Sequence, residues 1–298
     1  MSSTFKMPNF VGHTIPGAAY LFVGLWFLIQ IIRRLHRCYN TNNNHSDTTF
    51  RSTLYFPITI CGKTIKLDSW LVMIFCAIGM AIEIHSAVVG TNETKMNAAM
   101  QHIVMYFCFF TSGLASLIVP RLPPLLDSET VTYIAYALST IVEGILFIFH
   151  TKGQEAQEKT VHLLLIFTIF AQLVAILFEM RHRSNIYVSV SRAFFIMLQG
   201  TWFIQVSFLL FPPMTDLWGR LPQPKLEGEE LHSTVMFLAC LYCWHVAGLF
   251  ILVLLCCWLP FCCRRTKPSP HLPTTSNDHF EENNNCEDVQ LLLEIRET

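Results

Sequence analysis

Seven long apolar segments divide this sequence, and they constrain its fold more than any other feature. Each is near or above the ~20 residues that a helix needs to cross ~30 Å of hydrocarbon. Lipid offers backbone N–H and C=O groups no hydrogen-bond partner, so a helix is expected for every segment. The sequence therefore predicts an all-α, polytopic membrane protein with a seven-transmembrane helix bundle in residues 1–263. The segments cover residues 16–32, 70–90, 98–119, 130–150, 160–179, 187–211 and 232–259.

Composition supports the same conclusion and excludes several classes of protein. Hydrophobic residues make up 52% of the chain and charged residues only 14%, whereas a soluble domain carries about a quarter charged residues. The sequence has no glycine-rich phosphate loop, no nucleophile elbow and no basic patch suited to nucleic acid. The lipid bilayer is therefore the expected partner of the apolar surface, and a nucleic-acid partner is excluded.

The distribution of basic residues predicts the orientation of the bundle, because cytosolic loops are enriched in Lys and Arg. With a lumenal or extracellular N-terminus, twelve basic residues lie in cytosolic loops and six lie on the opposite side. The cytosolic set is Arg33, Arg34, Arg37, Arg51, Lys63, Lys66, Arg121, Arg181, Arg183, Arg264, Arg265 and Lys267. The opposite set is Lys6, Lys95, Lys152, Lys159, Arg220 and Lys225. The asymmetry predicts a lumenal or extracellular N-terminus and a cytosolic C-terminus.

Two N-glycosylation sequons allow a test of this orientation. Asn92 begins the sequon Asn-Glu-Thr in the loop after the second segment, on the predicted lumenal side, so a glycan is expected there. Asn44 begins the sequon Asn-His-Ser in a predicted cytosolic loop and should stay unmodified.

The end of the chain carries the features of a cytosolic tail. Residues 264–298 are rich in Pro, Ser, Thr, Asn and Glu and are expected to be disordered. Glu287, Leu291 and Leu292 form an acidic-dileucine pattern of the kind that clathrin-adaptor proteins read, which predicts sorting to endosomes and lysosomes. Four cysteines flank the end of the last apolar segment, where S-palmitoylation and ordinary packing are both open interpretations. They are Cys256, Cys257, Cys262 and Cys263.

Ionisable side chains inside the apolar segments are candidates for function, because each costs about 2.5 kcal/mol or more at the bilayer centre. Glu83 and Glu143 each lie seven residues from the predicted lumenal end of a span, ~10 Å deep at ~1.5 Å of rise per residue. His102 lies four residues into the third segment from the same side. The remaining candidates are His13, His150, His162 and His245. Acidic and imidazole groups are therefore expected to gather in the lumenal half of the bundle.

Three interpretations of these residues remain open. The first is a metal site holding zinc, with ligands from different helices such as His102 and Glu143, since no segment contains a His-Glu-x-x-His motif. The second is a water-lined or lipid-headgroup cavity that binds a substrate or relays protons. The third is a set of interhelical hydrogen bonds, each worth about 0.6–2 kcal/mol, that only fix helix packing.

Three other polar residues inside the apolar segments have simpler expectations. Gln199 and Gln205 are expected to form hydrogen bonds with neighbouring helices. Glu179 lies at the predicted cytosolic edge of the fifth segment, beside Arg181 and Arg183. It is expected to snorkel toward water and to pair with a nearby arginine.

Several stretches resemble a known family when they are taken together and in order. They are "GHTIPG" (12–17), "QHIVMYF" (101–107), "VEGILFIFH" (142–150), "QGTWFIQVSFLLFPP" (199–213) and "CWHVAGL" (243–249). This set is similar to the transmembrane protein 45 family, also described as domain of unknown function 716. The resemblance implies a multi-pass membrane protein of Golgi or lysosomal membranes and supplies no reaction. It also implies that the candidates inside these motifs belong to a common framework: His13, His102, Glu143, His150 and His245.

The sequence thus favours a non-enzymatic, multi-pass membrane protein of the Golgi, endosome or lysosome, with the plasma membrane as a further location. It would act through interactions or as a binder of small solutes. The alternative is a lumen-facing, metal-dependent membrane hydrolase or transporter that uses His102, Glu143 and Glu83. The seven-helix zinc hydrolases of the ceramidase and progestin-receptor type carry an HxxxH motif in the last span, where His245 stands alone here.

Overall fold

The computed structural model describes residues 7–42, 49–60, 63–89, 93–123, 127–151, 154–211 and 228–262. These residues form seven helices that are long and apolar enough to cross a membrane, which confirms the predicted all-α, multi-pass fold. The helices are α1 (Met7–Asn42), α2 (Leu67–Val89), α3 (Glu93–Ile118), α4 (Ser128–His150), α5 (Ala156–Arg181), α6 (Ile186–Leu210) and α8 (Gly228–Cys262). The first apolar segment is the shortest of the seven, yet α1 spans 36 residues because the helix extends beyond this segment in both directions.

Hydrogen bonds from side chains to the backbone fix where two of these helices begin. Asp127 accepts a hydrogen bond from the backbone N–H of Thr130 at 3.1 Å and caps α4. Asn185 accepts one from the N–H of Tyr187 at 2.9 Å and caps α6. Both residue types satisfy backbone donors that the first turn of a helix leaves unpaired. The short turn before Asn185 makes α5 and α6 an antiparallel pair.

Three short elements were not predicted from the sequence. Strands β1 (Ile58–Ile60) and β2 (Lys63–Ile65) pair antiparallel just before α2, with Ile58 opposite Ile65. The β-branched residues of both strands suit an extended backbone. A single 3-10 turn, η1 (Val119–Arg121), ends the α3 region.

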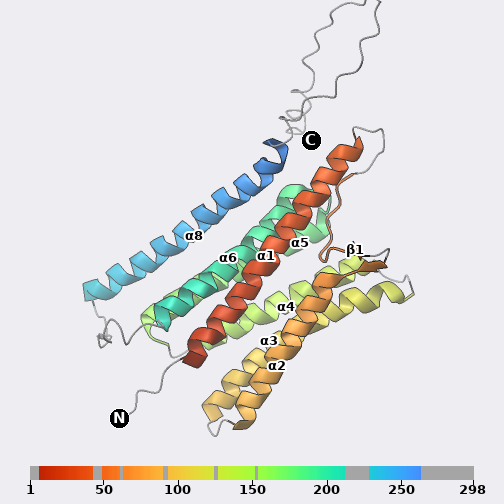
Figure 1. The fold of residues 1–298 in the computed structure, drawn as a ribbon. Coiled ribbons are helices and arrows are strands. Elements are labelled where there is room, and N and C mark those ends of the chain that lie inside the picture. The colour runs from red at the N-terminus through yellow and green to blue at the C-terminus, as the bar shows by residue number, and fades with distance from the viewer. Residues whose placement is uncertain are drawn as a thin grey trace, which may run out of the picture. The chain divides into compact units, whose positions relative to one another are not determined.

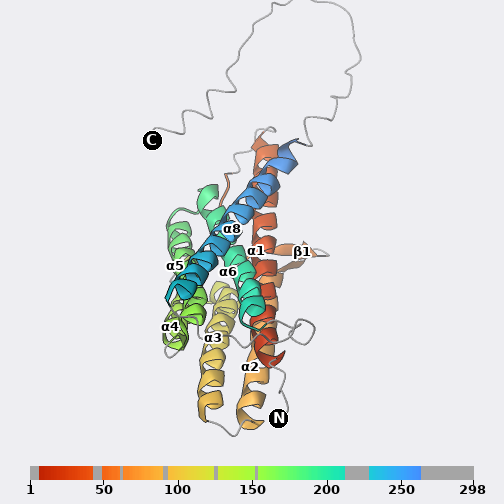
Figure 2. The ribbon, with the colours of Figure 1, turned by 90° about the vertical axis from the view of Figure 1, so that its left-hand side faces the viewer.

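Six of the helices form an arc in which each packs against the next. The order around the arc is α2, α3, α4, α5, α6 and α1, so the first and second helices of the chain are its two ends. Figures 1 and 2 show α1 beside α6 and the α2–α3 hairpin beside α4. From α2 to α6, each helix packs against the helix that follows it in the chain. The exception is α1, which packs against α6 instead of α2.

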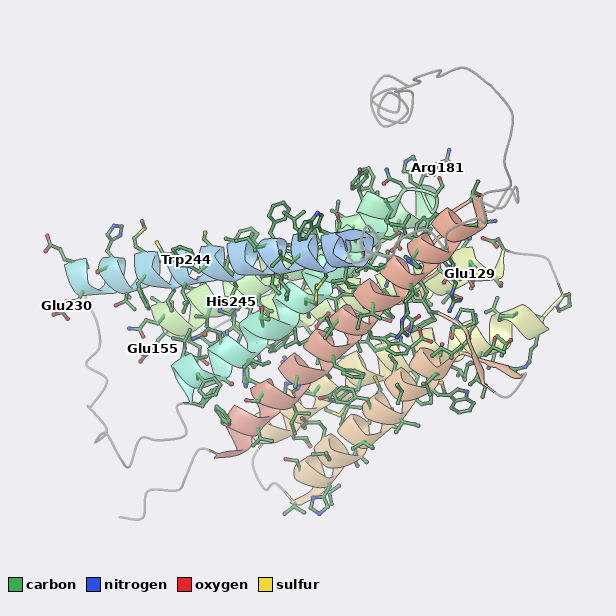
Figure 3. All side chains as sticks on the ribbon, turned by 45° about the horizontal axis from the view of Figure 1, so that its top comes forward. Glu129, Glu155, Arg181, Glu230, Trp244 and His245 are labelled. Atoms are coloured by element: carbon green, nitrogen blue, oxygen red, sulfur yellow. The ribbon has the colours of Figure 1, made fainter. Side chains whose placement is uncertain are left out.

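The seventh spanning helix, α8, lies outside the arc against α5 and α6 (Figures 1 and 2). Large aromatic side chains make the contact: the rings of Trp202 and Tyr242 are 5.1 Å apart and perpendicular. The hydroxyl of Tyr242 also hydrogen-bonds with that of Thr168 at 2.7 Å. Much of α8 is exposed, and Trp244 on its outer side is 75% exposed (Figure 3).

The exposed surface of the bundle is apolar in the middle and charged at its ends, as a membrane requires. Figure 3 shows Glu155 and Glu230 at one end of the bundle and Glu129 and Arg181 at the other. Between these ends the helices present large aliphatic and aromatic side chains outward, including Ile82 at 61% exposed. These side chains would face lipid tails and need no protein partner.

Glycines bring α1 and α6 into close contact. A Cβ atom added to Gly200 would lie 2.4 Å from the backbone nitrogen of Leu21 and 2.7 Å from the carbonyl oxygen of Gly17. On the α1 side, a Cβ at Gly24 would lie 2.8 Å from the backbone nitrogen of Met197. Small residues of this kind allow helix backbones to approach within a membrane, where van der Waals packing drives association.

Gly200→Ala should therefore lower the stability of the protein by about 1–3 kcal/mol, because α1 and α6 must separate to admit the methyl group. Thermal unfolding of the purified protein in detergent would measure the loss. Gly248→Ala is the matched control, since a Cβ at this helical glycine meets nothing within 4 Å. Equal stability of the two variants would contradict the proposed close contact.

Candidate functional site

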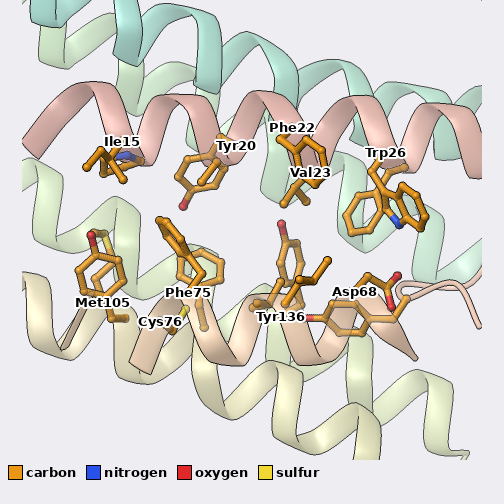
Figure 4. A pocket seen from close by; sticks show the side chains of 18 residues that line it. Ile15, Tyr20, Phe22, Val23, Trp26, Asp68, Phe75, Cys76, Met105 and Tyr136 are labelled. Atoms are coloured by element: carbon orange, nitrogen blue, oxygen red, sulfur yellow. The ribbon is translucent and has the colours of Figure 1, made fainter. Parts of the chain in front are cut away.

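A cavity of about 420 Å³ lies between α1 and α2, the two ends of the arc. Figure 4 shows side chains of α1 on one side of the cavity and Phe75, Cys76 and Met105 on the other, with Tyr136 between them. α1 contributes Tyr20, Val23 and Trp26, and α2 contributes Val72, Phe75 and Cys76. The lining is almost entirely aliphatic and aromatic, so the cavity suits an apolar molecule.

Residues at the rim of the cavity are exposed on the outer surface of the bundle. Ile15 is 51% exposed, Phe22 is 62% exposed and Leu71 is 45% exposed. All three lie in helices that are long and apolar enough to span a membrane. The cavity therefore opens sideways, toward the hydrocarbon of the bilayer.

Most polar groups that line the cavity already have protein partners. Tyr20 donates its hydroxyl to Glu143 at 2.7 Å, and the hydroxyl of Tyr55 hydrogen-bonds with that of Ser112 at 3.1 Å. Tyr136 accepts a hydrogen bond from the side-chain amide of Gln172 at 3.4 Å. Asp68, at one end of the cavity, accepts hydrogen bonds from the backbone N–H groups of Phe56 at 2.6 Å and Ser69 at 3.0 Å.

Trp26 carries a buried polar group of a different kind. It projects from α1 toward the cavity (Figure 4), and its indole nitrogen is buried with no hydrogen-bond partner among the described residues. A buried donor without a partner costs about 1–3 kcal/mol. The cavity thus combines an apolar lining with one N–H group that is available to a hydrogen-bond acceptor.

Behind the cavity wall, Glu143 joins three helices. Its Oε1 atom accepts hydrogen bonds from Tyr20 on α1 and from the Gln199 amide on α6, both at 2.7 Å. Glu143 and Gln199 are fully buried. These contacts confirm that Gln199 bonds to a neighbouring helix. They also hold the ring of Tyr20 at the cavity wall, where it stacks on Phe203 with the ring centres 6.1 Å apart.

A second buried cluster lies at the other end of α5 and α6. Glu179 and Arg192 are both fully buried and form an ion pair. Ser52 donates its hydroxyl to Glu179, and Arg192 donates to the backbone carbonyl of Thr53 at 3.3 Å. The prediction that Glu179 snorkels toward water is wrong, because the arginine that pairs with it lies in α6 and the pair is sealed inside the bundle.

This ion pair anchors the chain segment that enters α2, residues 50–57. Ser52, Leu54, Tyr55 and Phe56 are all buried, and the N–H of Ser52 donates to the carbonyl of Arg183 at 2.7 Å. No sequence motif predicted a role for this segment. The apolar triplet Leu54-Tyr55-Phe56 was the one signal of burial, and Tyr55 forms part of the cavity lining.

The predicted histidine and glutamate candidates are divided among separate contacts. His102 hydrogen-bonds through Nδ1 with Glu83 at 2.9 Å, between α3 and α2, whereas Glu143 has the partners described above. The ring centres of His150 and His162 are 5.4 Å apart, and those of His13 and His162 are 6.1 Å apart.

His245, the last of these candidates, lies on α8 with its ring centre 5.6 Å from that of Trp202. Within the parts of the chain that the structure describes, no three His, Cys, Asp or Glu residues are arranged to hold a metal ion. The zinc hypothesis therefore gains no ligand set from the described residues.

Of the predicted modification and sorting residues, only the cysteines of α8 lie within the described ranges. Cys256 and Cys257 are half-buried on α8, and Cys262 is the last residue of that helix. The remaining residues lie outside the described ranges: Asn92, Cys263, Glu287, Leu291 and Leu292.

Comparison with known proteins identifies relatives that share the membrane character of this chain. Residues 128–258 match the model of a family described as "Family of unknown function (DUF716)". Transmembrane epididymal protein 1A of Mus musculus is 25% identical over 260 residues, which cover 80% of this chain and 77% of that protein. Transmembrane epididymal protein 1 of Rattus norvegicus is 25% identical over 262 residues, with the same coverage of 80% and 77%. The human protein of the same name is 25% identical over 151 residues, 49% of this chain and 50% of its own length. These matches support an integral, multi-pass membrane protein and assign no reaction to it.

Removing one partner of the buried ion pair should be strongly destabilising. Glu179→Leu leaves Arg192 buried without a carboxylate, at an expected cost of about 3–5 kcal/mol of stability. The double variant Glu179→Leu with Arg192→Met should be more stable than the single variant, because apolar residues can replace a buried pair at little cost. Thermal unfolding in detergent would compare them.

The control for this comparison is a half-exposed pair at the same end of the bundle. Lys66 and Glu129 are 3.8 Å apart, with side chains 21% and 25% exposed. Lys66→Met should cost about 1 kcal/mol or less. If the double variant at Glu179 and Arg192 were less stable than the single variant, the loss of stability in Glu179→Leu would not come from an unpaired, buried Arg192.

Proposed function

We propose that this protein binds a lipid-like small molecule in the cavity between α1 and α2. The observation that carries the proposal is the sideways opening of an apolar cavity whose lining includes a buried donor with no partner among the described residues, the indole N–H of Trp26. The ligand is a molecule with a largely apolar body and one hydrogen-bond acceptor, such as the carbonyl of an acyl ester or the hydroxyl of a sterol.

The dimensions and chemistry of the cavity support this ligand class. A volume of about 420 Å³ falls within the roughly 300–1,000 Å³ that is typical of small-molecule sites. Since the rim residues are exposed on the spanning helices, a ligand dissolved in the bilayer reaches the cavity without crossing water. An acceptor placed against Trp26 would remove the cost of its unpaired N–H group.

The same contacts favour binding over catalysis. Tyr20, Tyr55, Tyr136 and Asp68 line the cavity, and each is engaged by another protein group. Their hydrogen bonds hold the cavity wall in one shape rather than presenting free acids or bases to a ligand. A rigid apolar wall that presents the buried N–H of Trp26 is suited to recognition.

We also propose a branch of the family, an orientation and a compartment for the protein. The sequence motifs support the transmembrane protein 45 branch of the family of unknown function. The Lys and Arg distribution supports a lumenal N-terminus and a cytosolic C-terminus. The acidic-dileucine pattern at Glu287, Leu291 and Leu292 supports residence in Golgi, endosomal or lysosomal membranes through clathrin-adaptor proteins.

Filling the cavity should prevent ligand binding. Ala19 lines the cavity, so Ala19→Phe should weaken binding about tenfold or more, equivalent to about 1.4 kcal/mol. Trp26→Phe removes the indole N–H, keeps an aromatic ring at the cavity wall and should weaken binding about fivefold, the value of one hydrogen bond. Photoactivatable, clickable sterol and fatty-ester probes in membranes, with mapping of the labelled peptides, would measure both effects.

Ala18→Phe is the matched control, since Ala18 is the adjacent residue of α1, is exposed and does not line the cavity. It should leave labelling of α1 and α2 unchanged. The proposal fails if neither probe labels these helices, or if the substitutions at Ala18 and Ala19 reduce labelling equally.

The proposed orientation predicts which sequon is used. Asn92→Gln should abolish a glycosidase-sensitive shift in electrophoretic mobility, because the loop that contains Asn92 faces the lumen in this orientation. Asn44→Gln should leave the mobility unchanged. A shift that depends on Asn44 instead would reverse the orientation.

A further inference from the structure

A second pocket, of about 400 Å³ and polar in character, lies at the end of the bundle where α5 finishes and α4 begins. Its walls come from the chain before Ser52, from the start of α4 and from the turn between α5 and α6. The residues that give it its chemistry are Arg51, Asp127, Thr130, Arg181, Arg183 and Ser184. It shares no lining residue with the cavity between α1 and α2.

One arginine of the pocket neutralises the carboxylate of Asp127. Arg183 donates to Asp127 and to the hydroxyl of Thr130, both at 2.7 Å. The hydrogen bonds from Thr130 and Arg183 lower the pKa of Asp127 to about 2, so its carboxylate is charged at neutral pH. Arg183 is only 9% exposed and lies over the ring of Tyr133, which fixes the position of its guanidinium.

The other two arginines of the pocket have no acidic partner among the described residues. Arg51 and Arg181 are exposed, and within the described parts of the chain neither guanidinium has an acidic partner. Three arginines and one aspartate therefore leave the pocket with a net charge of two positive units. The positive charges of Arg51 and Arg181 repel each other, so a bound anion would lower the electrostatic energy of the pocket.

Hydrogen bonds to the backbone hold the walls of this pocket in place. The N–H of Ser52 donates to the carbonyl of Arg183 at 2.7 Å, which joins the segment of Arg51 to the turn between α5 and α6. Arg34 on α1 donates to the carbonyl of Arg51 at 2.6 Å. The two exposed guanidinium groups therefore project from fixed backbone, and little ordering is needed when an anion binds.

We propose that this pocket binds a phosphate group, carried either by the headgroup of an anionic phospholipid or by a soluble phosphate. Guanidinium groups pair with phosphate oxygens in a two-pronged geometry, and a doubly charged phosphate monoester matches the net charge of the pocket. The pocket lies where the spanning helices end, which is the depth of lipid headgroups. Ser184 and Thr49 add hydroxyl donors for the remaining oxygens.

The test uses the full chain, purified in detergent or placed in nanodiscs of phosphatidylcholine with or without a phosphatidylinositol phosphate. Native mass spectrometry would detect retained phospholipid, and the shift in thermal unfolding temperature on adding inorganic phosphate would detect the soluble ligand. Arg51→Gln and Arg181→Gln should each weaken binding about fivefold, the contribution of one cation near a membrane surface. Arg181→Lys keeps the charge and should lose less.

Arg121→Gln is the matched control, because Arg121 is an exposed arginine that does not line the pocket. Retained phosphoinositide that depends on Arg51 and Arg181 identifies a lipid headgroup as the ligand. Stabilisation by inorganic phosphate with the same dependence, but without retained lipid, identifies a soluble phosphate. The proposal is overturned if neither ligand binds, or if Arg121→Gln weakens binding as much as the two pocket variants.

Discussion

The close packing of α1 against α6 decides how the other helices are arranged. Glycines at the contact let the two backbones approach, so the first helix of the chain lies beside the sixth instead of beside the second. The connection from α1 must then cross the end of the bundle to reach α2, and residues 50–57 make this crossing as a buried segment. The cavity exists for the same reason, since α1 and α2 become the two ends of an arc that side chains line but do not fill.

Buried polar groups reinforce this arrangement at two levels. Toward one side, Glu143 connects α4 to α1 and α6 through Tyr20 and Gln199. Toward the other, Glu179 and Arg192 connect α5 to α6 and hold the crossing segment through Ser52 and Thr53. In hydrocarbon such groups cannot exchange their partners for water, so each pairing favours one register of the helices over its alternatives.

Much of this architecture could be predicted from the sequence, because a membrane makes apolar length a direct indicator of helices. The depth of Glu143 in the membrane predicted that it needs a partner from another helix. The hydrogen bond of Gln199 to a neighbouring helix was predicted because a side-chain amide within a span needs a partner. The ion pair of Arg192 with Glu179 was not predicted, although an arginine inside an apolar segment requires an acid nearby. Glu179 lies near the end of α5 and Arg192 near the start of α6. Because a short turn joins these two helices, they run antiparallel, and this proximity could have predicted the pair.

The order of helices around the arc could not be predicted in this way. Apolar periodicity indicates where a helix runs and gives no information on which helix it contacts. The buried segment 50–57 has no helical period, and its anchors lie more than a hundred residues away along the chain, at Glu179, Arg183 and Arg192. Both binding sites proposed for this protein, the apolar cavity and the arginine pocket, include residues of this segment.

The sideways opening of the cavity also determines which concentration controls its occupancy. A molecule that enters between α1 and α2 exchanges with the hydrocarbon phase, so its binding equilibrium is set by its mole fraction among the membrane lipids. Solubility in water does not enter this equilibrium. A difference in lipid composition between two organelles would then change how many copies of the protein are occupied, even when the aqueous solution on both sides of the membrane is the same.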